Sequence, residues 1–161
     1  MSIDWKLLAD VRERQKTVAM GVVARDRAAA EQSQAQLMQA EALREQQQAN
    51  KLRHWEATRG ALSGGHCSVA EFRSAGAWSG ALDARIAQAG EAAAQAARAH
   101  SEREQVLEQS RLQLRAAHGE LEKAQQMQQR ARTERMHLRE LRLEDINEET
   151  TAQAWAMRRP A

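Results

Sequence analysis

The chain has 161 residues, and its 42% hydrophobic fraction includes one Phe and no Tyr. Alanine dominates that fraction and offers little apolar area to bury, so the composition argues against most globular enzymes. The 24 basic and 22 acidic residues give a net charge of only +2 and are interspersed, as on a solvated helix surface. This charge does not call for a polyanionic partner.

Two long helices are predicted, at about 3–59 and 80–148, separated by a glycine-rich joint at about 60–80. Both arms consist of strong helix formers, and the only proline is Pro160. The simplest arrangement is an all-α fold, a long two-helix antiparallel coiled-coil hairpin that forms a single domain over 1–161. At 1.5 Å per residue, each arm would be about 80 to 100 Å long. Residues after about 150 are expected to fray.

The first arm carries an apolar stripe at heptad spacing near its start and a second apolar patch near the joint. The stripe consists of Leu8, Val11, Val18 and Val22, with Gln15 in one core slot, and the patch of Leu52, Trp55 and Leu62. Both are expected to face the second arm.

The joint contains two local signals. Ser68 followed by Glu71 has the spacing of a capping box and predicts a short helix there. Residues 60–67 have the glycine spacing of a phosphate-binding loop, but His66 and Cys67 stand where Lys and Ser or Thr must be, so nucleotide binding is not expected. The apolar members of this segment, Val69, Phe72 and Trp78, would then lie at the tip of the hairpin.

The second arm contains an a/d seam. One slot holds Leu107, Leu114 and Leu121, and the other holds Ala117, Ala124, Ala131 and Leu138. Towards the joint the same two slots continue through residues half of which are small: Ile86, Ala93 and His100 in one, and Leu82, Ala89, Ala96, Arg103 and Ser110 in the other. The seam is therefore expected to be narrow and rich in alanine.

Catalytic, metal and cofactor sites are not expected. His54, His66 and Cys67 lie near the joint, but a structural zinc site needs four ligands and usually more than one cysteine. A lone cysteine cannot form an internal disulfide, and the N-terminus has no apolar signal core, which favours a cytoplasmic location. The longest uncharged run near the N-terminus is too short to span a bilayer.

Four arginines form a stripe on one face of the second arm near its end: Arg132, Arg135, Arg139 and Arg142. The stripe is either a solvated face balanced by Glu134 and Glu140, or a contact for an acidic protein surface or for nucleic acid. The low net charge and the acidic cluster at 144–149 argue against nucleic acid.

The pattern resembles the stalk proteins of bacterial type III secretion, the flagellar FliJ and injectisome YscO family of small cytoplasmic coiled-coil hairpins. The resemblance covers most of the chain. It rests on the length, on the two Ala/Gln/Glu/Arg-rich helices, and on two short segments. These are Leu-Ala-Asp-Val-Arg-Glu-Arg at 8–14 and Lys-Leu-Arg-His-Trp-Glu-Ala-Thr-Arg at 51–59. The glycine-rich joint and the crowded alanines at 84–99 depart from the family pattern.

The resemblance implies a non-enzymatic coupling role at the cytoplasmic face of the bacterial inner membrane, without insertion into it. The paired terminal ends would contact the hexamer of the secretion ATPase through Leu8, Arg12 and Lys16 together with the arginine stripe. The tip would contact the export gate protein or export chaperones through Phe72, Trp78 and Leu82. The main alternative is a generic dimeric scaffold whose helices pair between chains. A nucleic-acid-binding coiled coil comes third and an enzyme last.

Overall fold

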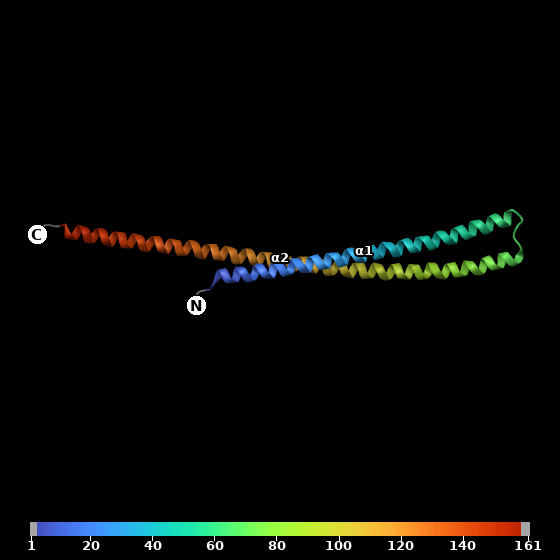
Figure 1. The fold of residues 1–161 in the computed structure, drawn as a ribbon, viewed down its shortest axis with the longest axis horizontal. Helices are drawn as coiled ribbons and strands as arrows, with labels where there is room; N and C mark the ends of the chain where they lie inside the picture. The colour runs from blue at the N-terminus through green and yellow to red at the C-terminus, as the bar shows by residue number, and fades with distance from the viewer. Residues whose placement is uncertain (1–2, 159–161) are drawn as a thin grey trace. The chain divides into compact units, whose positions relative to one another are not determined.

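The computed structural model describes residues 3–158 and contains two long helices. Helix α1 spans Trp5–Ser63 and helix α2 spans Val69–Met157, and no strand occurs among the described residues. Figure 1 shows α1 and α2 joined by one short turn and running in opposite directions. The predicted fold class, an all-α helical hairpin, is confirmed.

Helix α1 begins at Trp5 because Asp4 caps it. Asp4 Oδ1 accepts hydrogen bonds of 3.1 Å from the backbone N–H groups of Lys6 and Leu7. These two donors have no partner inside the helix, so the side-chain oxygen replaces water at the helix end. No proline occurs inside either helix, and nothing else in the sequence forbids helices of this length.

Contacts group the residues into two units, and each unit contains a segment of both helices. The terminal unit consists of Met1–Gly21 and Leu112–Ala161, and the turn unit consists of Val22–Arg111. Each unit has its own seam between α1 and α2.

In the terminal unit, α2 contributes the seam that the sequence predicts as far as Ala131. Leu121 and Ala124 are buried, and Leu114, Ala117 and Ala131 are half-buried. The predicted slot at Leu138 is wrong, because that side chain is exposed. Trp5, the first residue of α1, lines a groove with Gln128 and Ala131 of α2. Because α1 begins at this level, it does not extend far enough along α2 to cover Leu138.

The apolar stripe predicted for α1 is only partly correct. Leu8 and Val22 are half-buried, as expected, whereas Val11, Gln15 and Val18 are exposed. The neighbouring stripe enters the seam instead: Ala9 is buried, and Arg12, Lys16 and Ala19 are half-buried. The physical reason is the shape of the two basic side chains, whose aliphatic stems can cover the seam while their charges stay at its edge. One of them reaches α2: Arg12 Nη2 lies 3.8 Å from Glu120 Oε2.

In the turn unit, the α2 seam is narrow, as predicted. Its buried members are Ser79, Leu82, Ala89, Ala93, Leu107 and Ser110, and Ile86, Ala96 and His100 are half-buried. The predicted slot at Arg103 is wrong, because this residue is exposed. A guanidinium group is costly to bury without a partner, and the alanine-lined seam offers it none.

Polar side chains cross the seam of the turn unit and fix its antiparallel register. Ser33 Oγ lies 2.9 Å from His100 Nδ1, and Trp55 Nε1 donates a hydrogen bond of 3.2 Å to Ser79 Oγ. A third pair joins Lys51 Nζ to Asp83 Oδ1. Residue numbers rise along α1 as those of their partners fall along α2, which is the pattern of an antiparallel pair.

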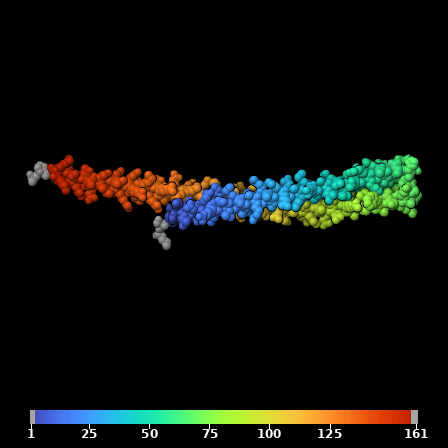
Figure 2. All heavy atoms as spheres, in the orientation of Figure 1, coloured from blue at the N-terminus to red at the C-terminus, as the bar shows by residue number. Residues whose placement is uncertain are grey.

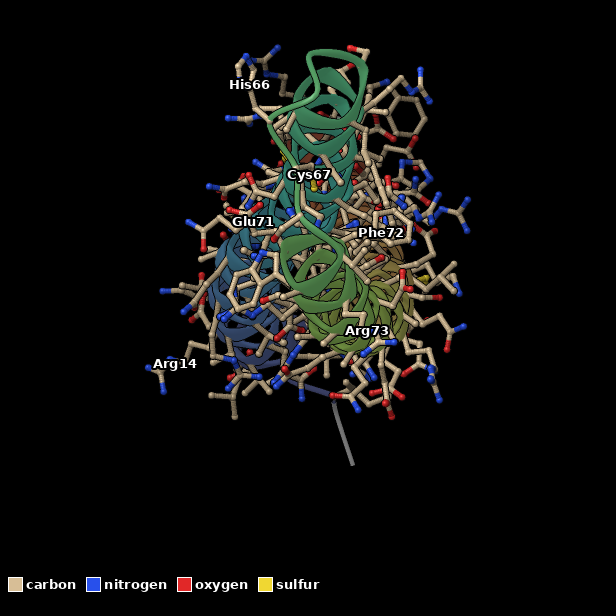
Figure 3. The ribbon with its side chains drawn as sticks, turned by 90° about the vertical axis from the view of Figure 1, so that its right-hand side faces the viewer. Arg14, His66, Cys67, Glu71, Phe72 and Arg73 are labelled. Atoms are coloured by element: carbon tan, nitrogen blue, oxygen red, sulfur yellow. The ribbon has the colours of Figure 1, made fainter. Side chains whose placement is uncertain are left out.

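The turn between the helices is built from a C-terminal cap followed by an N-terminal cap. Gly65 has φ +70°, and His66 N donates to Ala61 O at 3.0 Å while Gly65 N donates to Leu62 O at 3.2 Å. This is the Schellman pattern, which needs a left-handed residue that glycine supplies without a steric cost. Figure 3 views this turn end-on, with His66 and Cys67 on the connecting segment.

The capping box predicted at Ser68 is present and begins α2. The backbone N–H of Ser68 donates to Glu71 Oε2 at 2.6 Å, and the backbone N–H of Glu71 donates to Ser68 Oγ at 3.2 Å. The hydrogen bond that the Ser68 backbone N–H donates to the Glu71 carboxylate lowers the pKa of Glu71 below its ordinary value of 4.5. The side chain of Ser68 adds a smaller effect in the same direction.

Three further expectations are corrected. The joint is shorter than 60–80, since only residues 64–68 lie between the helices, because the capping box starts α2 directly after the Schellman turn. The patch near the joint faces α2 only through Trp55, which is half-buried and bonds to Ser79, whereas Leu52 and Leu62 are exposed. The helix does not end at 148 but continues to Met157, since no glycine or proline interrupts 149–157. The rest of the predicted tail, 159–161, lies outside the described residues.

Candidate protein interfaces

The predicted arginine stripe lies on an exposed helical segment of the terminal unit. Residues 132–157 of α2, here called the overhang, follow the last seam residue, Ala131, and all of them are exposed. Figure 1 shows this red end of α2 continuing past the blue start of α1, and Figure 2 shows it as a single helix in space-filling form. All side chains of the overhang are therefore accessible to solvent, and only its first turn borders the start of α1.

The four arginines are free to meet a partner. None of Arg132, Arg135, Arg139 and Arg142 forms an ion pair with another residue of 3–158, Glu134 and Glu140 included. Arg132 and Arg135 also line a groove of 280 Å³ with Asp4 and Trp5 at the start of α1. The stripe is a cationic surface that begins where the helix pair ends.

The three α1 residues predicted beside the stripe are less accessible. Leu8 is half-buried, and the side chains of Arg12 and Lys16 are 35% and 26% exposed. Arg12 Nη1 donates to Gln15 Oε1 at 2.9 Å, and Lys16 Nζ lies 3.7 Å from Glu13 Oε1. The charges of these residues are already engaged, so the arginines of α2 are the stronger candidates for a contact.

A local network also holds Glu120, the partner of Arg12 on α2. Lys123 Nζ donates a hydrogen bond of 2.9 Å to Glu120 Oε1. That hydrogen bond and the positive charge of Lys123 lower the pKa of Glu120 below its ordinary value of 4.5, and the charge of Arg12 adds a smaller effect in the same direction. The α1 residues of the predicted interface therefore already take part in contacts at the seam between the two helices.

At the other predicted interface, the turn, the three residues do not form one patch. Phe72 and Trp78 are 46% and 48% exposed, but they lie six residues apart on α2, which places them about 120° apart around the helix. The Arg85 guanidinium lies 5.2 Å from the centre of the Trp78 ring and partly covers it. Leu82 is only 4% exposed and packs in the seam, so it is not available to a partner.

Within residues 3–158, the side chains that could bind a metal ion are not grouped into a metal site. That part of the chain contains no group of three or more His, Cys, Asp or Glu side chains that could hold a metal ion. His54 Nε2 lies 3.1 Å from Ala75 O, and Cys67 is a half-buried free thiol. Neither described helix has a stretch both long and apolar enough to cross a bilayer.

Sequence reasoning missed two features of these surfaces. The apolar side chains Met136, Leu143 and Ile146 lie on the arginine face of the overhang, at spacings of seven and three residues that could have revealed them. The outward direction of Val11 and Val18 had no such signal, because it depends on which stripe of α1 meets α2.

Comparison with known proteins adds no neighbour: no family model, no curated protein and no solved structure matches the chain.

Proposed function

We propose that the chain is a non-enzymatic stalk component of a bacterial type III protein secretion apparatus. In this role it lies at the cytoplasmic face of the inner membrane and couples the hexameric secretion ATPase to the export gate. Export chaperones are further candidate partners. The proposal starts from the family resemblance, and the structure supports it through one observation, the exposed arginine stripe beyond the end of the helix pair.

A thin helical end with exposed positive charge is suited to entering an assembly of larger subunits. The seam next to the stripe is narrow, because small residues such as Ala9 and Ala124 are buried in it. Arg135 and Arg139 are both exposed on the overhang, and only Arg135 borders the start of α1, in the groove with Asp4 and Trp5. Arginine forms strong, geometrically defined pairs with carboxylates, so an acidic surface of the ATPase would be the complementary partner.

The test is the activity of the cognate secretion ATPase with and without this chain. We expect stimulation, and we expect Arg135→Glu combined with Arg139→Glu to weaken it at least tenfold while the helical content in circular dichroism stays unchanged. The matched control is Arg98→Glu with Arg103→Glu, which reverses two exposed charges in the turn unit. This control should stimulate like the unmodified chain.

Three results would count against the proposal. Absence of both stimulation and co-assembly at low salt would remove its basis. An equal loss of stimulation in the control variant would show that the effect depends on the net charge of the chain and not on the arginine stripe. Salt-sensitive binding to DNA or RNA with no effect on the ATPase would favour the nucleic-acid alternative.

A further inference from the structure

The overhang has the composition of a helix that packs against another helix. Leu138, Leu141, Leu143, Ile146 and Met136 are between 42% and 60% exposed. An isolated helix in water gains nothing from such residues, and most helical stability in proteins comes from packing of an apolar face. Among residues 3–158, no second helix covers these side chains.

One face of the overhang has the spacing of a coiled-coil core. Beginning at Arg132, residues separated alternately by four and three positions include Met136, Leu143 and Ile146. The remaining members of this face are Arg139, Thr150, Gln153 and Met157. The two aliphatic residues lie at its centre, so a partner helix that crosses there would bury both.

The charges along the overhang are divided into two halves of opposite sign. The first half contains the four arginines of the stripe with only Glu134 and Glu140 as acids, and the second half contains Glu144, Asp145, Glu148 and Glu149. A uniformly acidic partner long enough to cover both halves would be attracted by one and repelled by the other. A partner whose charges change sign in the opposite order matches both.

We propose that the overhang is a self-association site, in which two copies of the chain pair antiparallel through residues 132–157. In this arrangement Leu143 of one copy faces Ile146 of the other, and the reverse contact follows from the twofold symmetry. Arg142 and Glu149 occupy positions that flank the core, and the antiparallel arrangement brings each of them beside the other residue in the second copy. The basic half of each copy then lies along the acidic half of its partner.

The opposite orientation is disfavoured by the same residues. In a parallel pair the core residues face their own counterparts, so Arg132 would lie on Arg132 and Arg139 on Arg139. Like charges in direct opposition destabilise a helix pair. The antiparallel orientation is the one in which the apolar centre and the charge pattern agree.

This inference goes beyond the proposed function and has its own test. It concerns the chain alone, whereas the stalk role is measured with the ATPase present, so either can fail without the other. Because the stripe takes part in both contacts, self-association and binding to the ring would exclude each other.

The first experiment measures the mass of the full chain by sedimentation over a range of concentrations. We expect a reversible shift from the mass of one chain, 18.0 kDa, to twice that mass as concentration rises. A mass of one chain at every concentration would overturn the proposal.

Cross-linking then tests the orientation. In a Cys67→Ser background, Met136→Cys and Gln153→Cys place single thiols at exposed positions near opposite ends of the core face. A mixture of the two variants should form linked dimers on oxidation, and each variant alone should not, because identical thiols are far apart in an antiparallel pair. Dimers formed by each variant alone would indicate a parallel pair and contradict the proposal.

A charge exchange tests the flanking contact. In each of the two symmetric contacts, Arg142→Glu places a second negative charge beside Glu149 of the other copy, so association should weaken about tenfold. Adding Glu149→Arg in the same chain restores opposite charges and should restore association. The control is Arg130→Glu, which makes the same change on the opposite face of α2. An equal effect of both single substitutions, or no rescue by the double substitution, would show that this contact does not form.

Discussion

At the scale of single residues, the start of α2 depends on two side chains that satisfy each other's backbone. Ser68 and Glu71 exchange hydrogen bonds across the first turn, so two donors that the helix leaves without a partner are satisfied. Figure 3 shows Glu71 and Phe72 on opposite sides of the ribbon at this end of the helix. The connection between the helices can be as short as residues 64–68 because of this local arrangement.

The capping box predicts a specific dependence on pH. The pKa of Glu71 is lowered in the folded chain, so its charged form stabilises the fold above its ordinary value of 4.5, and this contribution is lost as the pH falls through the lowered pKa. We expect Glu71→Gln to lower the free energy of unfolding at neutral pH and to have progressively less effect below pH 4.5. Urea unfolding followed by circular dichroism measures both.

The control for this prediction is Glu91→Gln, which removes a charge from an exposed position inside α2. Its effect should not follow the same course with pH. Ser68→Ala removes the other half of the box and should cost about 1 kcal/mol at neutral pH. If Glu71→Gln has the same effect at neutral and acidic pH, its charge does not contribute through the cap.

At the scale of the helices, the sequence predicts α2 better than α1. The leucine and alanine slots of α2 recur every seven residues, so the buried face follows directly from the pattern. On α1 two stripes lie one residue apart, the apolar one with Val11 and Val18 and the polar one with Arg12 and Lys16. Which of them meets α2 is decided by contacts such as Arg12 with Glu120, and these depend on both helices.

The same limit applies to the candidate interfaces. The arginine stripe was predictable because its four members share one face and their exposure follows from where α1 begins. The accessibility of Leu82 was not predictable, since the same leucine belongs both to the apolar tip and to the seam. A tip contact could draw on Phe72, but Leu82 is already used for packing between the helices.

The narrowness of the α2 seam predicts that a larger residue is not tolerated there. Ala93 is only 4% exposed, whereas Ala92 is exposed on the same helix. We expect Ala93→Leu to lower the free energy of unfolding by about 1–3 kcal/mol, because the extra side chain must push the helices apart or adopt a strained rotamer. Ala92→Leu should change it by less than about 0.5 kcal/mol.

Thermal or urea unfolding of these two variants provides the measurement. Both substitutions exchange one strong helix former for another and add the same volume, so a difference between them reports on the seam and not on helix propensity. Equal effects would mean that residue 93 does not face α1.

At the scale of the whole molecule, the decisive question is whether α1 and α2 pair within one chain or between chains. In the structure the pairing is within the chain, and Ser33 with His100 is a close contact across the seam at 2.9 Å. The generic scaffold alternative would instead place the two residues on different chains. The turn at 64–68 makes the first arrangement possible, because Gly65 reverses the chain direction within a few residues.

Disulfide formation distinguishes these arrangements. In a Cys67→Ser background, we expect Ser33→Cys with His100→Cys to form a disulfide within one chain on mild oxidation, because the two side chains already touch. The product should migrate as a single chain on a non-reducing gel at every protein concentration. The control, Ala35→Cys with His100→Cys, places one thiol about 160° away on α1 and should not close the bond. Linked dimers that increase with concentration would show that α1 pairs with α2 of another copy, and the hairpin would then be an intermolecular assembly.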